Sequence, residues 1–173
     1  MDDIHQQPKR RRINDVVGSH PGASARDVQR LAGLAWGETA YHLDHLTKSG
    51  AVRRERGGRR DYYFRNDVSW DERKLLRCLR SPSQRHLLLT LTERPDLTLA
   101  NLSERTGLSP STTSFHLREL VAAGTVEGYR DGNVRGYRTV LPARVGELLR
   151  TYRESFRDRL VDSFVATWSS LIR

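Results

Sequence analysis

This sequence contains one cysteine, three lysines and no long apolar run. The single cysteine and the absence of an apolar run each exclude a class of protein. A single cysteine leaves no intramolecular disulfide and no multi-cysteine zinc site. No stretch of about 18 apolar residues occurs, so no membrane span is expected. The N-terminus is acidic and then basic with no apolar segment behind it, so we expect no signal peptide. These absences predict a cytoplasmic protein.

Arginine is what the chain has in excess. Its 173 residues carry 30 basic and 21 acidic side chains, a net charge of +9, and 27 of the 30 are arginine. The planar guanidinium group matches phosphates and guanine edges better than an ammonium group does. A basic chain with 36% hydrophobic residues is typical of a folded nucleic-acid-binding protein.

The chain contains one sequence unit twice. When residues 11–64 are aligned with residues 85–138, the two segments match without a gap and 13 positions are identical. The turn glycines are in register, with Gly33 opposite Gly107 and Gly50 opposite Gly124. A unit of this length exceeds the repeats of a solenoid, so we expect two small domains and a connector.

Each unit has the pattern of three helices followed by a β-hairpin. Gly107 permits the tight turn between the second and third helices of the second unit, and Gly124 ends the third helix. This order is typical of a winged helix-turn-helix domain. The expected elements of the second unit are helices at 82–91, 99–106 and 110–123 and strands at 125–130 and 134–138.

Residues 107–126, which begin Gly-Leu-Ser-Pro-Ser-Thr-Thr-Ser-Phe-His-Leu, resemble the helix-turn-helix of ArsR/MarR-type prokaryotic repressors. The tandem layout over residues 11–140 resembles archaeal two-winged-helix transcription regulators. The resemblance implies a mainly α fold with small β-wings (α+β) and a regulator that binds promoter DNA. Some ArsR-like proteins sense metals through cysteines on the recognition helix, and this chain has no cysteine there.

The chain is therefore expected to hold two tandem winged helix-turn-helix domains and a long C-terminal helix. Residues 9–12 are all basic and are expected either to enter a minor groove or to form a solvated tail. The predicted organisation is a flexible basic arm at 1–10, winged helix domains at 11–66 and 81–143, a connector helix at 67–80 and a C-terminal dimerisation helix at 144–173.

The DNA contacts are expected on the outward face of each third helix and on each hairpin. At about 100° per residue, Leu117, Leu120 and Val121 form a buried stripe, which leaves the opposite face for base edges. On that face Arg118 suits a guanine and Phe115 a thymine methyl group. The candidate DNA-binding residues are Tyr41, His45, Lys48, Arg53, Arg54, Arg56, Arg59, Arg60, Ser111, Thr112, Ser114, Phe115, Arg118, Arg130 and Arg135.

The two units differ in charge. Residues 1–65 carry 13 basic and 8 acidic side chains, a net +5, whereas residues 81–143 carry 7 and 6, a net +1. Asp44 stands where the second unit has Arg118, and a carboxylate there is unfavourable unless it accepts from a cytosine amine. We therefore expect the first wing to supply phosphate affinity and the second helix to read more of the bases.

Residues 144–173 lack proline and repeat apolar side chains at helical spacing, which predicts one helix through nearly the whole segment. Such a stripe is too long for one winged helix to cover. Two alternatives are that this helix packs back onto the connector helix or docks another protein. Homodimerisation is the first interpretation, through Leu149, Tyr152, Phe156, Leu160, Phe164 and Trp168.

No catalytic pattern stands out, and His42 and His45 lack a third metal ligand in the sequence. We expect no enzyme activity, no cofactor and no metal, and the sequence identifies no effector. The predicted function is a sequence-specific, double-stranded DNA-binding transcription regulator, homodimeric and associated with the nucleoid. The alternatives are an architectural, chromosome-associated DNA-binding protein and a winged-helix protein-interaction adaptor. Charge alone does not distinguish RNA from DNA.

Overall fold

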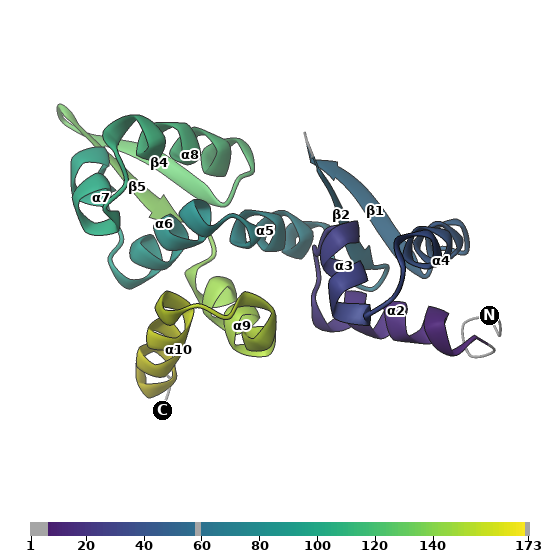
Figure 1. Ribbon diagram of the computed structural model, residues 1–173. Helices are drawn as coiled ribbons and strands as arrows, with labels where there is room; N and C mark the ends of the chain where they lie inside the picture. The colour runs from purple at the N-terminus through teal and green to yellow at the C-terminus, as the bar shows by residue number, and fades with distance from the viewer. Residues whose placement is uncertain (1–6, 58–59, 172–173) are drawn as a thin grey trace. The chain divides into compact units, whose positions relative to one another are not determined.

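The computed structural model describes residues 7–57 and 60–171 and divides into two compact units, Met1–Arg73 and Lys74–Arg173. Each unit contains three helices followed by a β-hairpin (Figure 1). Helix α5 (Trp70–Arg80) runs across the division between the units. The predicted fold class, α+β winged helices in tandem, is confirmed.

The first unit buries apolar side chains from all three of its helices. Ile13, Val17 and Val28 are fully buried, and Leu43 and Leu46 are at most 2% exposed. Burying each such side chain stabilises the fold by about 1.5–3 kcal/mol. The elements of this unit are α2 (Pro8–Ser19), α3 (Ala25–Ala32), α4 (Trp36–Lys48), β1 (Val52–Gly57) and β2 (Arg60–Arg65).

Helix α3 is capped at both ends, and its C-terminal cap begins the turn into helix α4. At the first turn of α3, the Ser24 hydroxyl accepts a hydrogen bond from the Asp27 amide at 3.2 Å, and the Asp27 carboxylate accepts one from the Ser24 amide at 3.3 Å. This capping box satisfies two amides that the helix leaves free. At the other end Gly33 has φ 62°, a conformation that favours glycine.

The second unit repeats this arrangement and adds a third strand. The short strand β3 pairs with β5, with Leu97 opposite Tyr137, so the sheet order is β3-β5-β4. This strand is not predictable from the sequence, because two residues are too few to show a period. The elements are α6 (Pro82–Glu93), β3 (Leu97–Thr98), α7 (Leu99–Thr106), α8 (Pro110–Ala122), β4 (Val126–Asp131) and β5 (Val134–Thr139).

Two local predictions are wrong. Helix α2 begins at Pro8, so the basic residues 9–12 are helical and do not form part of a flexible arm; residues 1–6 of the predicted arm lie outside the described residues. Arg10 is only 2% exposed, because helical spacing places it on the same face as Ile13 and Val17. Val121 was predicted to be buried and is 37% exposed, since it lies at the edge of the buried stripe of α8.

The prediction of a single long C-terminal helix is also wrong. The segment forms α9 (Pro142–Thr151), a 3-10 turn (Arg153–Phe156) and α10 (Arg159–Leu171). The break occurs where Asp158 accepts a hydrogen bond from the Val161 amide at 2.9 Å and so caps α10. Asp158 also accepts from Arg85 Nη2 at 2.5 Å.

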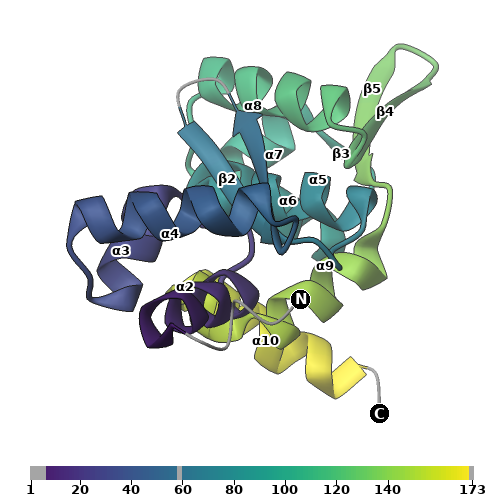
Figure 2. The same cartoon turned by 90° about the vertical axis from the view of Figure 1, so that its right-hand side faces the viewer.

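Helices α9 and α10 lie side by side (Figures 1 and 2). The stripe expected to dimerise is therefore largely covered within its own unit: Leu149, Phe156 and Phe164 are at most 3% exposed. Tyr152 and Trp168 are half-buried, and Leu160 is 46% exposed. Helices α9 and α10 are covered mainly by each other and by α6, whereas the expected connector helix, α5, contributes a hydrogen bond from Arg80 to the Ser155 carbonyl.

His42 and Arg10 are among the ionisable side chains that lie in the interior of the first unit. His42 is 6% exposed and Arg10 is 2% exposed. Burial lowers the pKa of His42, the positive charges of Arg10, Lys9 and His45 lower it further, and the Glu38 carboxylate opposes them. The folded unit therefore holds this imidazole in its neutral form at a pH where a free histidine begins to protonate.

We expect the first unit to lose stability as the pH falls from about 7 to 5. The unfolded chain binds a proton at His42 near the ordinary pKa of about 6.5, above the folded value, so unfolding takes up a proton and acid favours it. His42→Gln should flatten this dependence, measured as hydrogen exchange of α4 amides against pH. His116→Gln, at the equivalent position of the second unit, is the matched control. An unchanged pH slope in His42→Gln would contradict the assignment.

Gly146 offers a test of the helical hairpin. A Cβ atom at this position would collide with the indole ring of Trp168, so Gly146→Ala should reduce the free energy of unfolding by about 1–3 kcal/mol. In one continuous helix the same change would raise stability by up to about 1 kcal/mol. Urea unfolding measures the difference. In a Trp168→Ala background the penalty should disappear, and a stabilising effect of Gly146→Ala in the unmodified chain would contradict the hairpin.

Candidate nucleic-acid interface

Helix α8 presents the predicted outward face of the second unit. It begins after Ser109, whose hydroxyl accepts from the Thr112 amide at 3.2 Å. Phe115 is 50% exposed, Arg118 and Ser111 are exposed, and Ser114 is half-buried. The hydroxyl groups of Thr112 and Ser111 lie 2.8 Å and 3.0 Å from Ser109 Oγ, so both of these predicted contact residues interact with the cap; Thr112, whose amide also donates to Ser109, is the more closely engaged. Apart from Thr112, the predicted residues place an aromatic ring, two hydroxyls and a guanidinium on one face.

Helix α4 occupies the same place in the first unit. Tyr41 is 59% exposed, and its ring meets that of His42 edge to face at 5.2 Å between centroids. His45 is half-buried. Lys48 pairs with Asp44 at 2.7 Å, which raises the pKa of Lys48 and partly cancels the charge of both. The acidic residue that was expected to disfavour DNA thus has a neutralising partner on its own helix.

The first wing carries exposed arginines on an antiparallel hairpin. Arg53 donates to Asn66 Oδ1 at 3.2 Å, and Arg54 pairs with Asp61 at 2.5 Å. Arg56 and Arg60 are exposed. The predicted contact residue Arg59 lies outside the described residues.

Glu55 offsets less of this positive charge than composition suggests. Its carboxylate pairs with Arg73 Nε at 2.5 Å, and the two side chains are only 12% and 8% exposed. The same guanidinium lies over the Trp70 ring at 5.4 Å. The acidic residue of strand β1 is therefore directed away from solvent, and the outward positions of this strand are left to Arg53, Arg54 and Arg56.

The second wing combines arginine with tyrosine. Arg130 and Arg135 are predicted contact residues; Arg135 is exposed and Arg130 lies beside it on the hairpin. The Arg135 guanidinium lies over the Tyr137 ring at 5.3 Å, and Arg138 lies over Tyr129 at 5.4 Å. These stacked pairs hold two guanidinium groups in fixed orientations along the hairpin. Tyr129 and Arg138 were not predicted from the sequence, although alternation along the strands places the two together on the face of the hairpin opposite Arg130 and Arg135.

One exposed aromatic residue was also missed. Trp36 begins helix α4 and is 48% exposed, and the Arg26 guanidinium lies over its ring at 5.5 Å. A large apolar side chain at this level of exposure is noteworthy beside a predicted binding face. The repeat aligns Trp36 with Pro110. A tryptophan directly after the α3–α4 turn, where the second unit has a proline, was the feature of the sequence that could have identified it.

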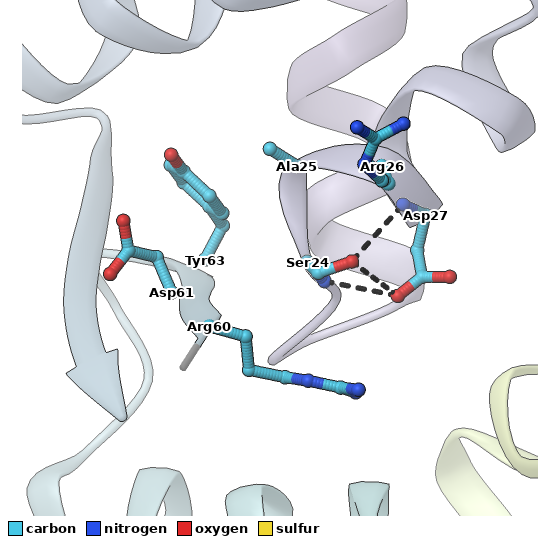
Figure 3. A pocket seen from close by; sticks show the side chains of 7 residues that line it. All are labelled: Ser24, Ala25, Arg26, Asp27, Arg60, Asp61 and Tyr63. Atoms are coloured by element: carbon cyan, nitrogen blue, oxygen red, sulfur yellow. Dashed lines mark hydrogen bonds between the residues drawn. The ribbon is translucent and has the colours of Figure 1, made fainter. Parts of the chain in front are cut away.

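A hollow of about 410 Å³ lies between the first turn of α3 and strand β2. Figure 3 shows the Ser24–Asp27 hydrogen bonds on one side of it and Asp61 and Tyr63 on the other. Burial is the main cause that raises the pKa of Tyr63. The two arginines that line the hollow, Arg26 and Arg60, are matched by the two carboxylates, so it does not favour an anion over a cation.

No group of three or more potential metal ligands occurs among residues 7–57 and 60–171. Across the same residues, each helix is too short or too polar to cross a membrane.

Comparison with known families gives two matches that do not overlap. Residues 7–76 match a family model described as an N-terminal HTH domain, and residues 80–127 match one described as winged helix-turn-helix DNA-binding. The search of curated proteins gives no match.

Among solved structures, a similar chain is the DIP2311 protein from Corynebacterium diphtheriae, at 18% identity and a TM-score of 0.31. The similarity covers 79% of this chain and 27% of that one, so this chain spans about a quarter of that protein's length. A TM-score this low does not bear on fold or function.

The two family matches divide the chain as the internal repeat does, with one helix-turn-helix in each half. The second is a DNA-binding family by description, and helix-turn-helix domains are typical of regulators without enzyme activity. Each half of the chain therefore carries a helix-turn-helix domain, which supports DNA as the partner.

Proposed function

We propose that this protein is a sequence-specific transcription regulator that binds double-stranded promoter DNA with both units. The observation that carries the proposal is that each unit exposes an aromatic side chain at the same position of its recognition helix, Tyr41 at 59% and Phe115 at 50%. Each helix is followed by a hairpin that bears exposed arginines. A helix that fits the major groove and a basic wing beside it are the two parts that such recognition needs.

In this proposal the two units make different kinds of contact with DNA. The first wing supplies phosphate contacts, which give affinity that depends on salt and not on sequence. Helix α8 supplies base contacts through Arg118, with Ser111 and Ser114 as adaptable hydrogen-bonding groups.

The finer assignment is an ArsR/MarR-like regulator that acts as a homodimer on the nucleoid. A dimer presents four winged helices, and half-sites read from successive major grooves lie about 10 base pairs apart or a multiple of that. Of the residues predicted to form the dimer surface, Leu160 is exposed in this fold and Tyr152 and Trp168 are half-buried. These three side chains remain for a dimer contact.

Selection from random duplexes at two salt concentrations, followed by sequencing, tests the proposal. A recovered motif whose affinity falls steeply with salt supports it. Retention without a motif supports the architectural alternative, which the arginines of the first wing favour because phosphate contacts carry no sequence information. Absence of retention at low salt contradicts DNA binding by the intact chain.

We expect Arg118→Ala to relax base preference at one position of the motif. A bidentate contact with guanine contributes about 1–3 kcal/mol of discrimination, and the truncated side chain no longer reaches the base. Affinities for the motif and for its single-base variants measure the change. Arg105→Ala, the same substitution at an exposed position on α7, is the control. An equal loss of affinity for all sequences would refute base reading by Arg118.

We expect Arg56→Ala with Arg60→Ala to weaken binding to all sequences alike. Each lost phosphate contact reduces the slope of log affinity against log salt by about 0.9, so the double variant should lose up to about 2. Titrations at several salt concentrations measure the slope. Arg94→Ala with Arg105→Ala removes the same charge from exposed positions outside both wings and should change the slope less. Equal slopes in the two double variants would argue against the first wing as the phosphate-binding element.

A further inference from the structure

The outward faces of the two recognition helices differ in chemistry at equivalent positions. The internal repeat places Gly37 opposite Ser111 and Ala40 opposite Ser114. Thus the first helix lacks a hydroxyl group at both of these positions, where the second helix has one. The next two equivalent pairs are Tyr41 with Phe115 and Asp44 with Arg118.

The charged groups of α4 are partly neutralised by pairing. Asp44 pairs with Lys48 at 2.7 Å, and Glu38 pairs with Lys9 of α2. The central part of the face is formed by exposed Gly37, Ala40 and Tyr41. The Tyr41 ring lies edge to face with buried His42, so this surface combines the Ala40 methyl group and an aromatic ring with one phenol hydroxyl.

Gly37 is a glycine that its own unit does not require. A Cβ atom built there meets no atom within 4 Å, and its φ lies outside the range that favours glycine. Glycine within a helix costs up to about 1 kcal/mol relative to alanine. Glycine also permits close approach of another molecule to the backbone, and the space above Gly37 opens toward the outward face of α4.

The apolar group that B-DNA displays in its major groove is the C5-methyl group of thymine. Resting on the DNA-binding function proposed above, we propose that α4 reads thymine methyl groups. Ala40 and the Tyr41 ring contact the methyl groups, and Gly37 lets the helix approach the base edges. The first unit therefore recognises an A·T-containing half-site mainly by apolar contact, whereas α8 adds the hydrogen-bonding groups of Ser111, Ser114 and Arg118 to the apolar contact of Phe115.

Replacement of thymine by deoxyuridine tests this directly, because it removes the methyl group and leaves base pairing unchanged. Using the full chain and its selected duplex, each thymine is replaced in turn. Under α4 each replacement should weaken binding about threefold to fivefold, as expected for loss of one buried methyl contact. Tyr41→Ala should remove the sensitivity at one position, and the matched variant Phe115→Ala should leave that position sensitive.

Gly37→Ala provides a second test, in which a loss of DNA affinity cannot be explained by destabilisation of the fold. The added methyl group has space in the free protein, so thermal stability should be unchanged or slightly higher, while affinity for the selected duplex should fall about tenfold or more. Ala122→Gly, at the far end of α8, changes one methyl group in the opposite sense and serves as a control for helix propensity. Unchanged affinity in Gly37→Ala would overturn the close approach.

The outcomes separate this inference from the function on which it rests. If the unmodified chain binds a motif that is insensitive to deoxyuridine, or one without A·T pairs under α4, the inference fails and the proposed function stands. If the unmodified chain selects no motif, the proposed function fails first. If Gly37 and Tyr41 variants change the sedimentation of the free protein and not its DNA affinity, the face is a protein interface and the inference is overturned.

Discussion

Burial of two leucines on each recognition helix sets the geometry on which the interface depends. Leu43 and Leu46 on α4, and Leu117 and Leu120 on α8, are each at most 2% exposed. Turning either helix by one residue, about 100°, would bring these side chains toward water at a cost of several kcal/mol. The outward positions are therefore determined by what the inward positions bury. Variation at those outward positions leaves the scaffold unchanged.

The duplicated scaffold carries two different surfaces. Its first copy has an arginine-bearing wing and a recognition helix whose charges are paired with one another. The second copy has exposed Arg118 and hydroxyl groups on the helix and a wing whose arginines stack on tyrosines. Because phosphate attraction is independent of sequence and base contacts are not, the two copies are suited to different parts of one binding event. Under the function proposed above, a single chain combines affinity with discrimination.

The C-terminal segment illustrates the limit of reasoning from periodicity. Apolar spacing predicted that this segment is helical, but the same spacing suits one long helix or two short ones that cover each other. The break depends on Asp158, which caps α10 and pairs with Arg85, and on Arg80, which donates to the Ser155 carbonyl at 3.1 Å. The two arginines come from a part of the sequence far from this segment, so no local pattern reveals them.

The sequence by itself determined the repeat, the order of three helices and a hairpin in each unit, the turn glycines and most of the outward positions of α4 and α8. These features are local: a helix period, a cap or a positive φ involves residues within a few positions of one another. Only the tertiary structure decided that Arg10 is interior, that Glu55 turns inward to Arg73 and that β3 joins the second sheet. It also decided that the apolar side chains of the C-terminal segment are buried by the packing of α9 against α10. Each of these depends on contacts between segments distant in the chain, where burial and charge pairing outweigh local preference.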